Sequence, residues 1–358
     1  STALPQTPTP TAWVAGVATP SAATSHAQWW QRFNDPLLST LVSQALQANT
    51  TVRSAQAALQ QARALRDVKS ANLIPTMTAA ASAQSSRSGD IDAINSFKAG
   101  FDASWEPDVF GAKRSALNAA EADARAAETN LADVHVSIAA EVAITYTELR
   151  GLQARLAIAR NNLASQSETQ QITAWRAQAG LASSLDLEQA RAASAQTSAQ
   201  IPTLATSAVQ AQNSLAVLTA QAPGALQATL GATGSLLQAP GDLAISIPAQ
   251  TLRQRPDVRT AEHRVSAALA RVAQADAARY PGFQISGSLG LSALNLGGLT
   301  AAGSAVNTLL ASVSVPLFDA GAARAQVRAQ EAALEQTRVG YQATVLTKVL
   351  SSAIDASA

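Results

Sequence analysis

The sequence contains one pattern of predicted secondary structure twice, and this internal repeat restricts the fold more than any other feature. Matching positions are 206 residues apart before the predicted strands and 210 residues apart after them. They are Val52-Arg53-Ser54-Ala55 with Val258-Arg259-Thr260-Ala261, Pro75 with Pro281, Gly111 with Gly321, Arg114 with Arg324, and Glu121 with Glu331. Both copies change from helical to strand periodicity and back in the same order. We therefore predict a mainly α-helical chain built from a duplicated helix–strand–strand–helix unit.

Two segments of each copy alternate apolar and polar residues with the two-residue period of a half-buried strand. The apolar members are Phe97, Phe101, Trp105, Phe283, Ile285, Leu289, Val313 and Val315, and the polar members are Lys98, Asp102, Glu106, Gln284 and Ser286. Each segment has about ten residues, which is the length of a tilted membrane-spanning strand. Aromatic residues at the junctions with helices fit either a membrane-interface girdle or packing at a corner. They are Trp105, Phe110, Tyr280 and Phe283.

A very long helix follows the first pair of predicted strands, over residues 112–179. At 1.5 Å per residue it would be on the order of 100 Å long, which globular domains seldom hold. Gly180 then marks a turn. Ser183 or Ser184 is expected to cap the returning helix, and Asp186 would complement its dipole.

The predicted organisation begins with an extended N-terminal strap over residues 1–35, in which Trp29 and Trp30 anchor the folded part. The other parts are the first repeat at 36–222 (helices 36–74, strands 76–86 and 97–106, helix 112–179, tip 180–186, return helix 187–218), an irregular linker at 223–248, and the second repeat at 249–358 (helix 250–280, strands 282–292 and 308–317, helix 321–358). Asn49 or Thr50 is expected to separate two helices in the first helical stretch. The second repeat is the shorter one, so we interpret the chain as C-terminally incomplete.

Composition and charge exclude several classes of function. Lys plus Arg number 25 against 24 Asp plus Glu, so the formal net charge of +1 gives no reason to expect a nucleic-acid partner. The sequence has no Cys, which excludes thiolate metal sites and Cys nucleophiles in this segment. His26, His135 and His263 lack metal-site spacing, and no phosphate-binding or dinucleotide-binding fingerprint occurs. We expect neither an enzyme nor a cofactor.

A sheet of four such strands cannot stand alone in a membrane. The chain has no run of 18 apolar residues, so membrane contact would have to be made by strands or by a lipid. Unpaired backbone groups at a sheet edge are costly in lipid, and the strands must therefore close with those of other copies. Two copies would supply eight strands and three copies twelve, and a polar lumen requires the larger barrel. We expect a homotrimer with a twelve-stranded barrel, whose apolar strand residues contact lipid and whose polar strand residues line the lumen.

Three groups of residues carry a resemblance to a known family. They are Trp29-Trp30 with Phe33-Asn34-Asp35-Pro36, Arg255-Pro256-Asp257-Val258-Arg259 with Ala261-Glu262-His263, and Val315-Pro316-Leu317-Phe318. With this ordered set, essentially the whole chain resembles the outer-membrane factors (TolC-like) of tripartite efflux pumps, and among them the outer-membrane efflux lipoprotein (NodT-type) branch. The resemblance implies a trimer in the bacterial outer membrane with a periplasmic α-barrel of long helices. It also implies a passive exit duct for small amphiphilic compounds or drugs, as in multidrug resistance, supplied by an inner-membrane pump through a periplasmic adaptor.

The resemblance also assigns roles to particular positions. The tip that meets the adaptor corresponds to Gly180, Leu181, Ser183, Ser184, Leu185 and Asp186. Many members carry a lipidated Cys as their first mature residue; position 1 here is Ser, so that Cys lies upstream or is absent. The gate residues of the family would fall beyond Ala358, and a second tip is expected near about residue 390 if the repeat spacing persists.

Two alternatives stay open. Within the family, the cargo could be metal ions, signal molecules or polypeptides, although the single Met, Met77, and the lack of Cys disfavour a soft-metal route. A protein of another class, a soluble coiled-coil-like periplasmic adaptor or scaffold, would explain the long helices. It would leave the alternating strands in repeat register without an explanation.

Overall fold

The structure is a computed structural model that describes residues 26–87, 89, 92–232, 234–237 and 255–355. Contacts divide these residues into two compact units. One unit holds residues 58–130 together with those described from 255 onward, and the other holds residues 26–57 and 131–237. The expected strap up to residue 25 and the linker residues 238–248 lie outside the described part.

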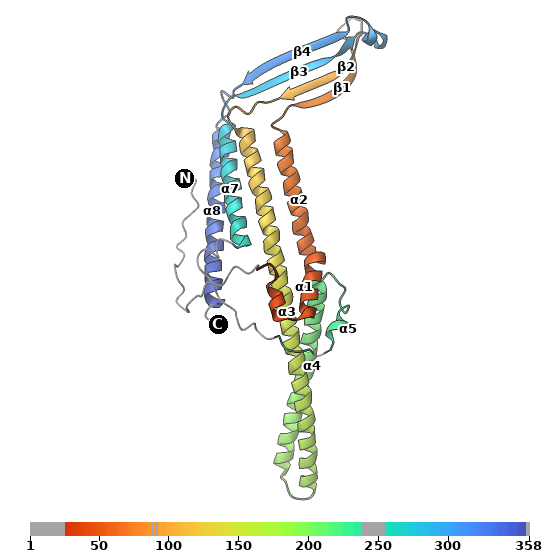
Figure 1. Cartoon of the computed structure of the whole chain (residues 1–358), viewed down its shortest axis with the longest axis vertical. Coiled ribbons are helices and arrows are strands. Elements are labelled where there is room, and N and C mark those ends of the chain that lie inside the picture. Colours follow the sequence, from red (N-terminus) through yellow and green to blue (C-terminus); the bar gives the residue numbers. More distant parts are fainter. Residues whose placement is uncertain (1–25, 88, 90–91, 233, 238–254, 356–358) are drawn as a thin grey trace. The chain divides into compact units, whose positions relative to one another are not determined.

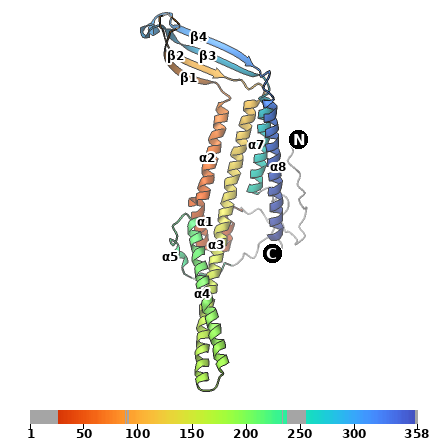
Figure 2. The same ribbon diagram turned by 180° about the vertical axis from the view of Figure 1, so that it is seen from behind.

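The elements follow the order of the predicted duplication (Figures 1 and 2). They are η1 (His26–Phe33), α1 (Pro36–Ala48), α2 (Thr50–Ala71), β1 (Thr76–Ser86), β2 (Ile94–Trp105), α3 (Ala112–Gln178), α4 (Ser184–Leu218), α5 (Gln227–Leu230), α7 (Pro256–Ala277), β3 (Gly282–Ala293), η2 (Leu296–Thr300), β4 (Ala305–Ser314) and α8 (Ala322–Asp355). The strands form one antiparallel sheet in the order β1-β2-β3-β4, so each repeat supplies one hairpin. The duplicated helix–strand–strand–helix architecture is confirmed. None of the helices in the described ranges is both long and apolar enough to cross a membrane.

Landmarks of the two repeats have the same conformation. Gly111 and Gly321, which precede α3 and α8, have φ angles of +81° and +85°. Side chains rarely tolerate this left-handed region, so glycine allows the same turn from strand to helix in both repeats. Val52 and Val258 are 0% and 2% exposed, and each lies in the core of its own unit.

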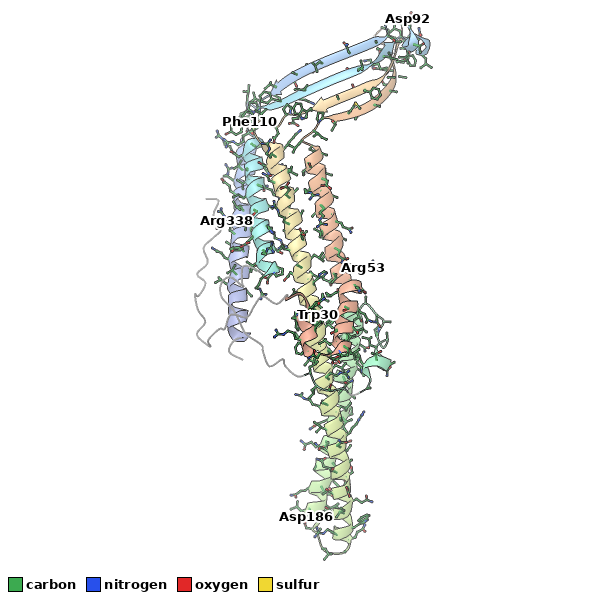
Figure 3. The ribbon with its side chains drawn as sticks, in the orientation of Figure 1. Trp30, Arg53, Asp92, Phe110, Asp186 and Arg338 are labelled. Atoms are coloured by element: carbon green, nitrogen blue, oxygen red, sulfur yellow. The ribbon has the colours of Figure 1, made fainter. Side chains whose placement is uncertain are left out.

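The unit of residues 26–57 and 131–237 has a continuous apolar core. Leu38 and Val42 of α1, Tyr146 of α3 and Leu215 of α4 are almost fully buried in it. Trp30, labelled in Figure 3, is buried beside them. Burial of side chains of this size contributes about 1.5–3 kcal/mol each. The prediction that the N-terminal aromatic residues anchor the folded part is confirmed.

A buried polar network fastens the segment after α4 to α3. The Arg150 guanidinium donates to the Gln153 side-chain oxygen at 2.8 Å and to the Ala232 carbonyl at 2.9 Å. It also lies over the Tyr146 ring, 5.0 Å from the centroid. Burial raises the pKa of Tyr146, whose hydroxyl donates to the Asp35 carboxylate at 2.8 Å. Asp35 caps α1, so one chain of contacts joins three segments of this unit.

The other unit packs α7 against α8 and the first part of α3. Val258 and Val265 of α7 lie with Leu334 and Val345 of α8 in a second apolar core. Several alanines of α3 are buried, and their small side chains let neighbouring helices approach closely. The hydroxyls of Thr260 on α7 and Thr129 on α3 are 2.8 Å apart and form a buried hydrogen bond.

Element bounds differ from the predicted ones at several points. Residues 26–33 form the short helix η1 within the strap expected to be extended. The predicted separation of two helices within residues 36–74 is confirmed and lies at Asn49, which accepts hydrogen bonds from the backbone N–H groups of Thr51 and Val52. β2 and β4 each begin three residues earlier than predicted, because the hairpin ends pair more fully than the polar loop composition indicated.

Candidate functional site

The register of the sheet gives it one predominantly apolar face. Trp105 lies opposite Ile285, Phe101 opposite Leu289, and Phe283 opposite Val313. Side chains of directly paired residues share a face, and the face alternates along each strand. The apolar face therefore collects Met77, Ala79, Ala81, Ala83, Phe97, Ala99, Phe101, Ala103, Trp105, Phe283, Ile285, Leu289, Leu291, Leu309 and Val313.

The opposite face is lined mainly by hydroxyl and amide side chains. Lys98 pairs with Ser292 and Ser82, and Asp102 pairs with Ser288 and Thr78. The other polar members are Thr76, Gln84, Ser86, Ser96, Ser104, Gln284, Ser286, Thr308, Ser312 and Ser314, and the large apolar exceptions are Ile94, Val306 and Leu310. Within the four strands, Lys98 and Asp102 are the only charged residues.

The polar face is hollowed near its centre. A cavity of about 360 Å³ lies on it, lined by side chains from all four strands that include Ser82, Lys98, Ser288 and Thr308. Its floor is formed where Gly100 of β2 pairs with Gly290 of β3. A Cβ atom at Gly100 would lie 2.7 Å from the Gly290 Cα atom, so only glycine fits there. The hollow lies where Ala80, Gly100 and Gly290, paired in a row across three strands, leave the polar face without long side chains.

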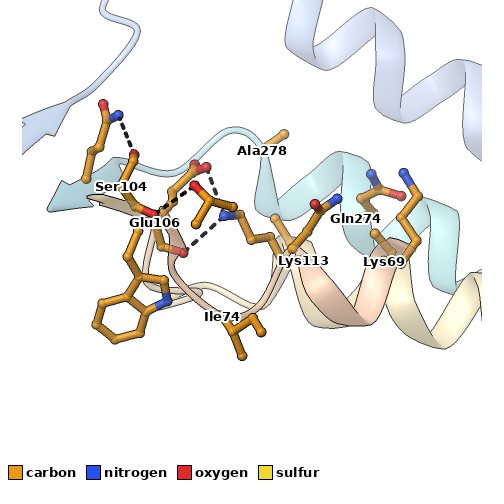
Figure 4. Close-up of a pocket in the computed structure, with 13 residues that line it drawn as sticks. Lys69, Ile74, Ser104, Glu106, Lys113, Gln274 and Ala278 are labelled. Atoms are coloured by element: carbon orange, nitrogen blue, oxygen red, sulfur yellow. Dashed lines mark hydrogen bonds and ion pairs between the residues drawn. The ribbon is translucent and has the colours of Figure 1, made fainter. Parts of the chain in front are cut away.

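A second cavity lies at the junction of the sheet with the helices (Figure 4). It has a volume of about 440 Å³ and is lined by Lys69 of α2, Lys113 of α3 and polar-face residues such as Gln284. Lys113 Nζ contacts the Glu106 carboxylate at 3.1 Å and the Glu106 carbonyl oxygen at 3.2 Å. One of the two ammonium groups is thus neutralised, and Lys69 leaves the cavity weakly cationic.

Aromatic residues of both repeats meet at this end of the sheet. The Phe110 ring stacks on Tyr280 with centroids 5.0 Å apart, and lies 6.3 Å from the Phe283 ring. Trp105 donates through its indole N–H to the Leu73 carbonyl at 3.0 Å. The sequence placed these residues at junctions, but it carried no signal that Phe110 and Tyr280, far apart in the chain, stack on each other.

The turn between α3 and α4 is a well-capped helical tip. Gly180 has φ +73°, and Ser183 caps α4. The Ser183 hydroxyl accepts from the Asp186 N–H at 3.1 Å, and the Asp186 carboxylate accepts from the Ser183 N–H at 3.0 Å and from its hydroxyl at 2.7 Å. These hydrogen bonds lower the pKa of Asp186, which Figure 3 shows at the turn. Of the two predicted capping residues, Ser183 is the cap and Ser184 is the first residue of α4.

The tip also exposes large apolar side chains. Leu181 and Leu185 are 72% and 65% exposed, and Trp175 in the last turn of α3 is 60% exposed. Clustered exposed apolar residues often mark a protein–protein interaction site. Sequence reasoning named the two leucines but missed Trp175, which the helical pattern alone does not distinguish from a packed residue.

Two of the predicted site residues, Glu106 and Val315, fall just outside the strands. β2 ends at Trp105, one residue before Glu106, and β4 ends at Ser314, one residue before Val315. A proline follows each of them, at positions 107 and 316. Proline has no N–H to donate to the ladder and restricts the residue before it, so both strands stop there. Glu106 instead forms the ion pair with Lys113 at the junction.

The sequence of this chain matches a family profile described as outer membrane efflux protein over residues 41–221 and 247–353. The chain belongs to this family. Its members are channel and transport proteins that work as outer-membrane components of efflux systems. This outer membrane efflux protein is accordingly an exit duct in the bacterial outer membrane with a periplasmic helical extension, and one component of a pump assembly. The family assignment excludes the soluble scaffold that the long helices alone would have allowed.

Individual relatives agree with the assignment. Outer membrane protein OprJ of Pseudomonas aeruginosa is 30% identical over 354 residues, which is 96% of this chain and 73% of OprJ. Nodulation protein T of Rhizobium leguminosarum bv. viciae is 28% identical over 349 residues, 97% of this chain and 72% of that protein. The solved structure of the outer-membrane channel OprN superimposes with a TM-score of 0.88 at 34% identity, covering 100% of this chain and 82% of OprN.

Proposed function

We propose that three copies of this outer membrane efflux protein form one continuous duct whose twelve-stranded barrel crosses the outer membrane. The observation that carries the proposal is the continuous register of the sheet, which keeps one apolar and one polar face across all four strands. β1 and β4 are the edges of this sheet and are available for pairing with other copies. Closing such edges is required in lipid, where unpaired backbone groups have no water to bond.

The polarity of the two faces supports a specific orientation in the barrel. A membrane barrel has an apolar outer surface and a polar interior, and the polar face of this sheet carries Lys98, Asp102, Gln284 and Ser286. These residues then face the lumen. The lipid-facing set consists of Phe97, Phe101, Trp105, Phe283, Ile285, Leu289 and Val313, with Val315 immediately beyond β4.

The helical tip is the proposed contact with a periplasmic adaptor, which joins the duct to an inner-membrane pump. The capping box of Ser183 and Asp186 gives the turn a defined shape, while Leu181 and Leu185 offer apolar surface. A cysteine introduced at Leu181 should crosslink to the adaptor in cells that express the whole pump. A cysteine at Arg191, about two turns after the start of α4, serves as the control. Equal crosslinking at both positions, or none at Leu181, would contradict the contact.

Small amphiphilic organic compounds are the proposed cargo. Relatives named for toluene efflux, TtgF, and for cation efflux, CusC, show that cargo differs among members. Two observations favour organic cargo for this chain. The single Met, Met77, lies on the apolar face, and no cluster of three or more His, Cys, Asp or Glu suited to a metal ion occurs in the described residues.

Conductance tests the proposal. The full-length protein, extracted in detergent and added to a planar bilayer, should open stepwise ion-conducting pores without any pump. Cells that lack their own duct should regain tolerance to hydrophobic drugs, but not to copper, when they express this protein with its pump and adaptor. A protein that leaves the envelope in detergent-free buffer and never conducts would contradict the proposed function.

A further inference from the structure

The two charged residues of the strands occupy opposite ends of one hollow. Lys98 and Asp102 both line the cavity on the polar face, and Gly100 lies between them in β2. Four residues along a strand span about 13 Å, which is too far for a direct ion pair. Neither side chain forms an ion pair or hydrogen bond with any residue in the described part of the chain. Each charge is therefore available to a solute.

The space between the two charges is kept open by the glycine pair. Gly290 lies opposite Gly100, and a Cβ atom at Gly290 would be 2.6 Å from the Ala99 carbonyl oxygen. The floor of the hollow is thus bare backbone. Ser82, Ser288, Ser292 and Thr308 surround it with hydroxyl groups that can donate and accept hydrogen bonds. The cavity of about 360 Å³ has a cation toward one end, an anion toward the other, and neutral walls in which hydroxyl groups lie beside Ala80 and Val306.

We propose that this hollow is a binding site for zwitterionic solutes, with the solute carboxylate toward Lys98 and its ammonium group toward Asp102. The inference rests on the proposed function, because only a lumen-facing hollow meets the cargo. A simple anion is attracted by one end and repelled by the other, whereas a zwitterion with well-separated charges satisfies both. Lys98 and Asp102 lie four residues apart, about 13 Å along the strand, so each faces a different end of a bound solute.

The direction of β2 determines which of the two charged residues a solute meets first. β2 ends at Trp105 beside the helices, and its other end is the hairpin loop. Asp102 is nearer the helices and Lys98 nearer the loop, so a solute that leaves the periplasmic part meets the carboxylate first. Because the two side chains carry opposite charges, substitution of one or the other should shift ion selectivity in opposite directions.

Bilayer recordings with three matched peptides test the site. Triglycine is the zwitterion, N-acetyl-triglycine the anion and triglycine amide the cation. In the full-length channel, triglycine should reduce the ion current more than either singly charged peptide does. K98Q or D102N should weaken this effect by about two- to fivefold, the range of one exposed ion pair. K98Q should also raise the cation-to-anion permeability ratio, and D102N should lower it.

The control is S96Q, which adds the same amide two residues from Lys98 on the same face without removing a charge. It should leave the peptide preference and the permeability ratio as in the wild type. A wild-type channel that conducts but responds equally to the three peptides would overturn this inference alone. So would a K98Q variant that assembles, conducts and keeps the preference for triglycine. A wild-type protein that does not conduct would overturn the proposed function as well.

Discussion

Gly290 faces Gly100 across β2 and β3, where the two backbones leave no room for a side chain. G290A would place a Cβ atom 2.9 Å from the Gly100 Cα atom. Overpacking of this kind typically costs about 1–3 kcal/mol, so the thermal midpoint of the assembled protein should fall. G287A on the same strand is the control, because its Cβ atom would come no closer than 3.5 Å to its neighbours. Equal midpoints for the two variants would contradict the close approach.

Ser183 is the residue on which the shape of the tip depends. S183A removes the cap of α4 and should cost roughly 0.5–2 kcal/mol of local helix stability. Hydrogen exchange of the first-turn amides of α4 measures this loss. S184A is the matched control, since Ser184 makes no capping bond. Faster exchange in both variants alike would contradict the assignment of the cap.

The Asp186 carboxyl gives the tip a pH dependence of known sign. Its pKa is lowered by hydrogen bonds from Ser183, so its stabilising contribution is present above the unfolded pKa of about 3.9. The contribution is lost as the pH falls through the lower folded value. Exchange at the tip should therefore accelerate in acid, and the difference between wild type and S183A should narrow. A difference that stays constant into strong acid would be evidence against the carboxylate bonds.

Asn49 shows how one residue organises whole elements. It ends α1, caps α2 and donates its side-chain amide to the Leu218 carbonyl at the end of α4, at 2.9 Å. N49A would leave this buried carbonyl without its partner, at a cost of about 1–3 kcal/mol. We expect a lower thermal midpoint for N49A than for T50A, which changes an exposed neighbour. A T50A variant that is equally destabilised would contradict the role of Asn49 in connecting α1, α2 and the end of α4.

At the scale of elements, residue periodicity predicted the type and order of the helices and strands, and local geometry decided where some of the strands begin and end. The first strand was expected over residues 76–86 and has those bounds, because Pro75 ends the preceding helical segment and the two-residue alternation begins directly after it. The ends of β2 and β4 were placed too late, since the prolines that stop them outweigh the apolar residues around them. Polar loop composition gave no sign that Ile94 would pair with Ser86.

Only part of the candidate site could be predicted from the sequence. Alternation indicated that Lys98 and Asp102 share a face, but the hollow between them depends on Gly290, which lies in the other repeat. No local pattern records which residues of two distant hairpins become neighbours. The junction cavity around Lys69 and Lys113 likewise forms only when α2, α3 and the strands come together.

At the scale of the whole molecule, the central claim is that β1 of one copy pairs with β4 of the next until three copies close. Residues 1–358 contain no Cys, so within them only the introduced thiols can be oxidised. Cysteine pairs can be placed in turn at residues 80 and 82 of β1 and at residues 306, 308 and 310 of β4. Mild oxidation in outer membranes should give, for at least one pair, a ladder of covalent species on a denaturing gel. Three copies in a closed ring should give a ladder that ends at the trimer. A ladder that ends at the dimer or continues beyond the trimer would contradict it, as would a protein that stays monomeric for every pair.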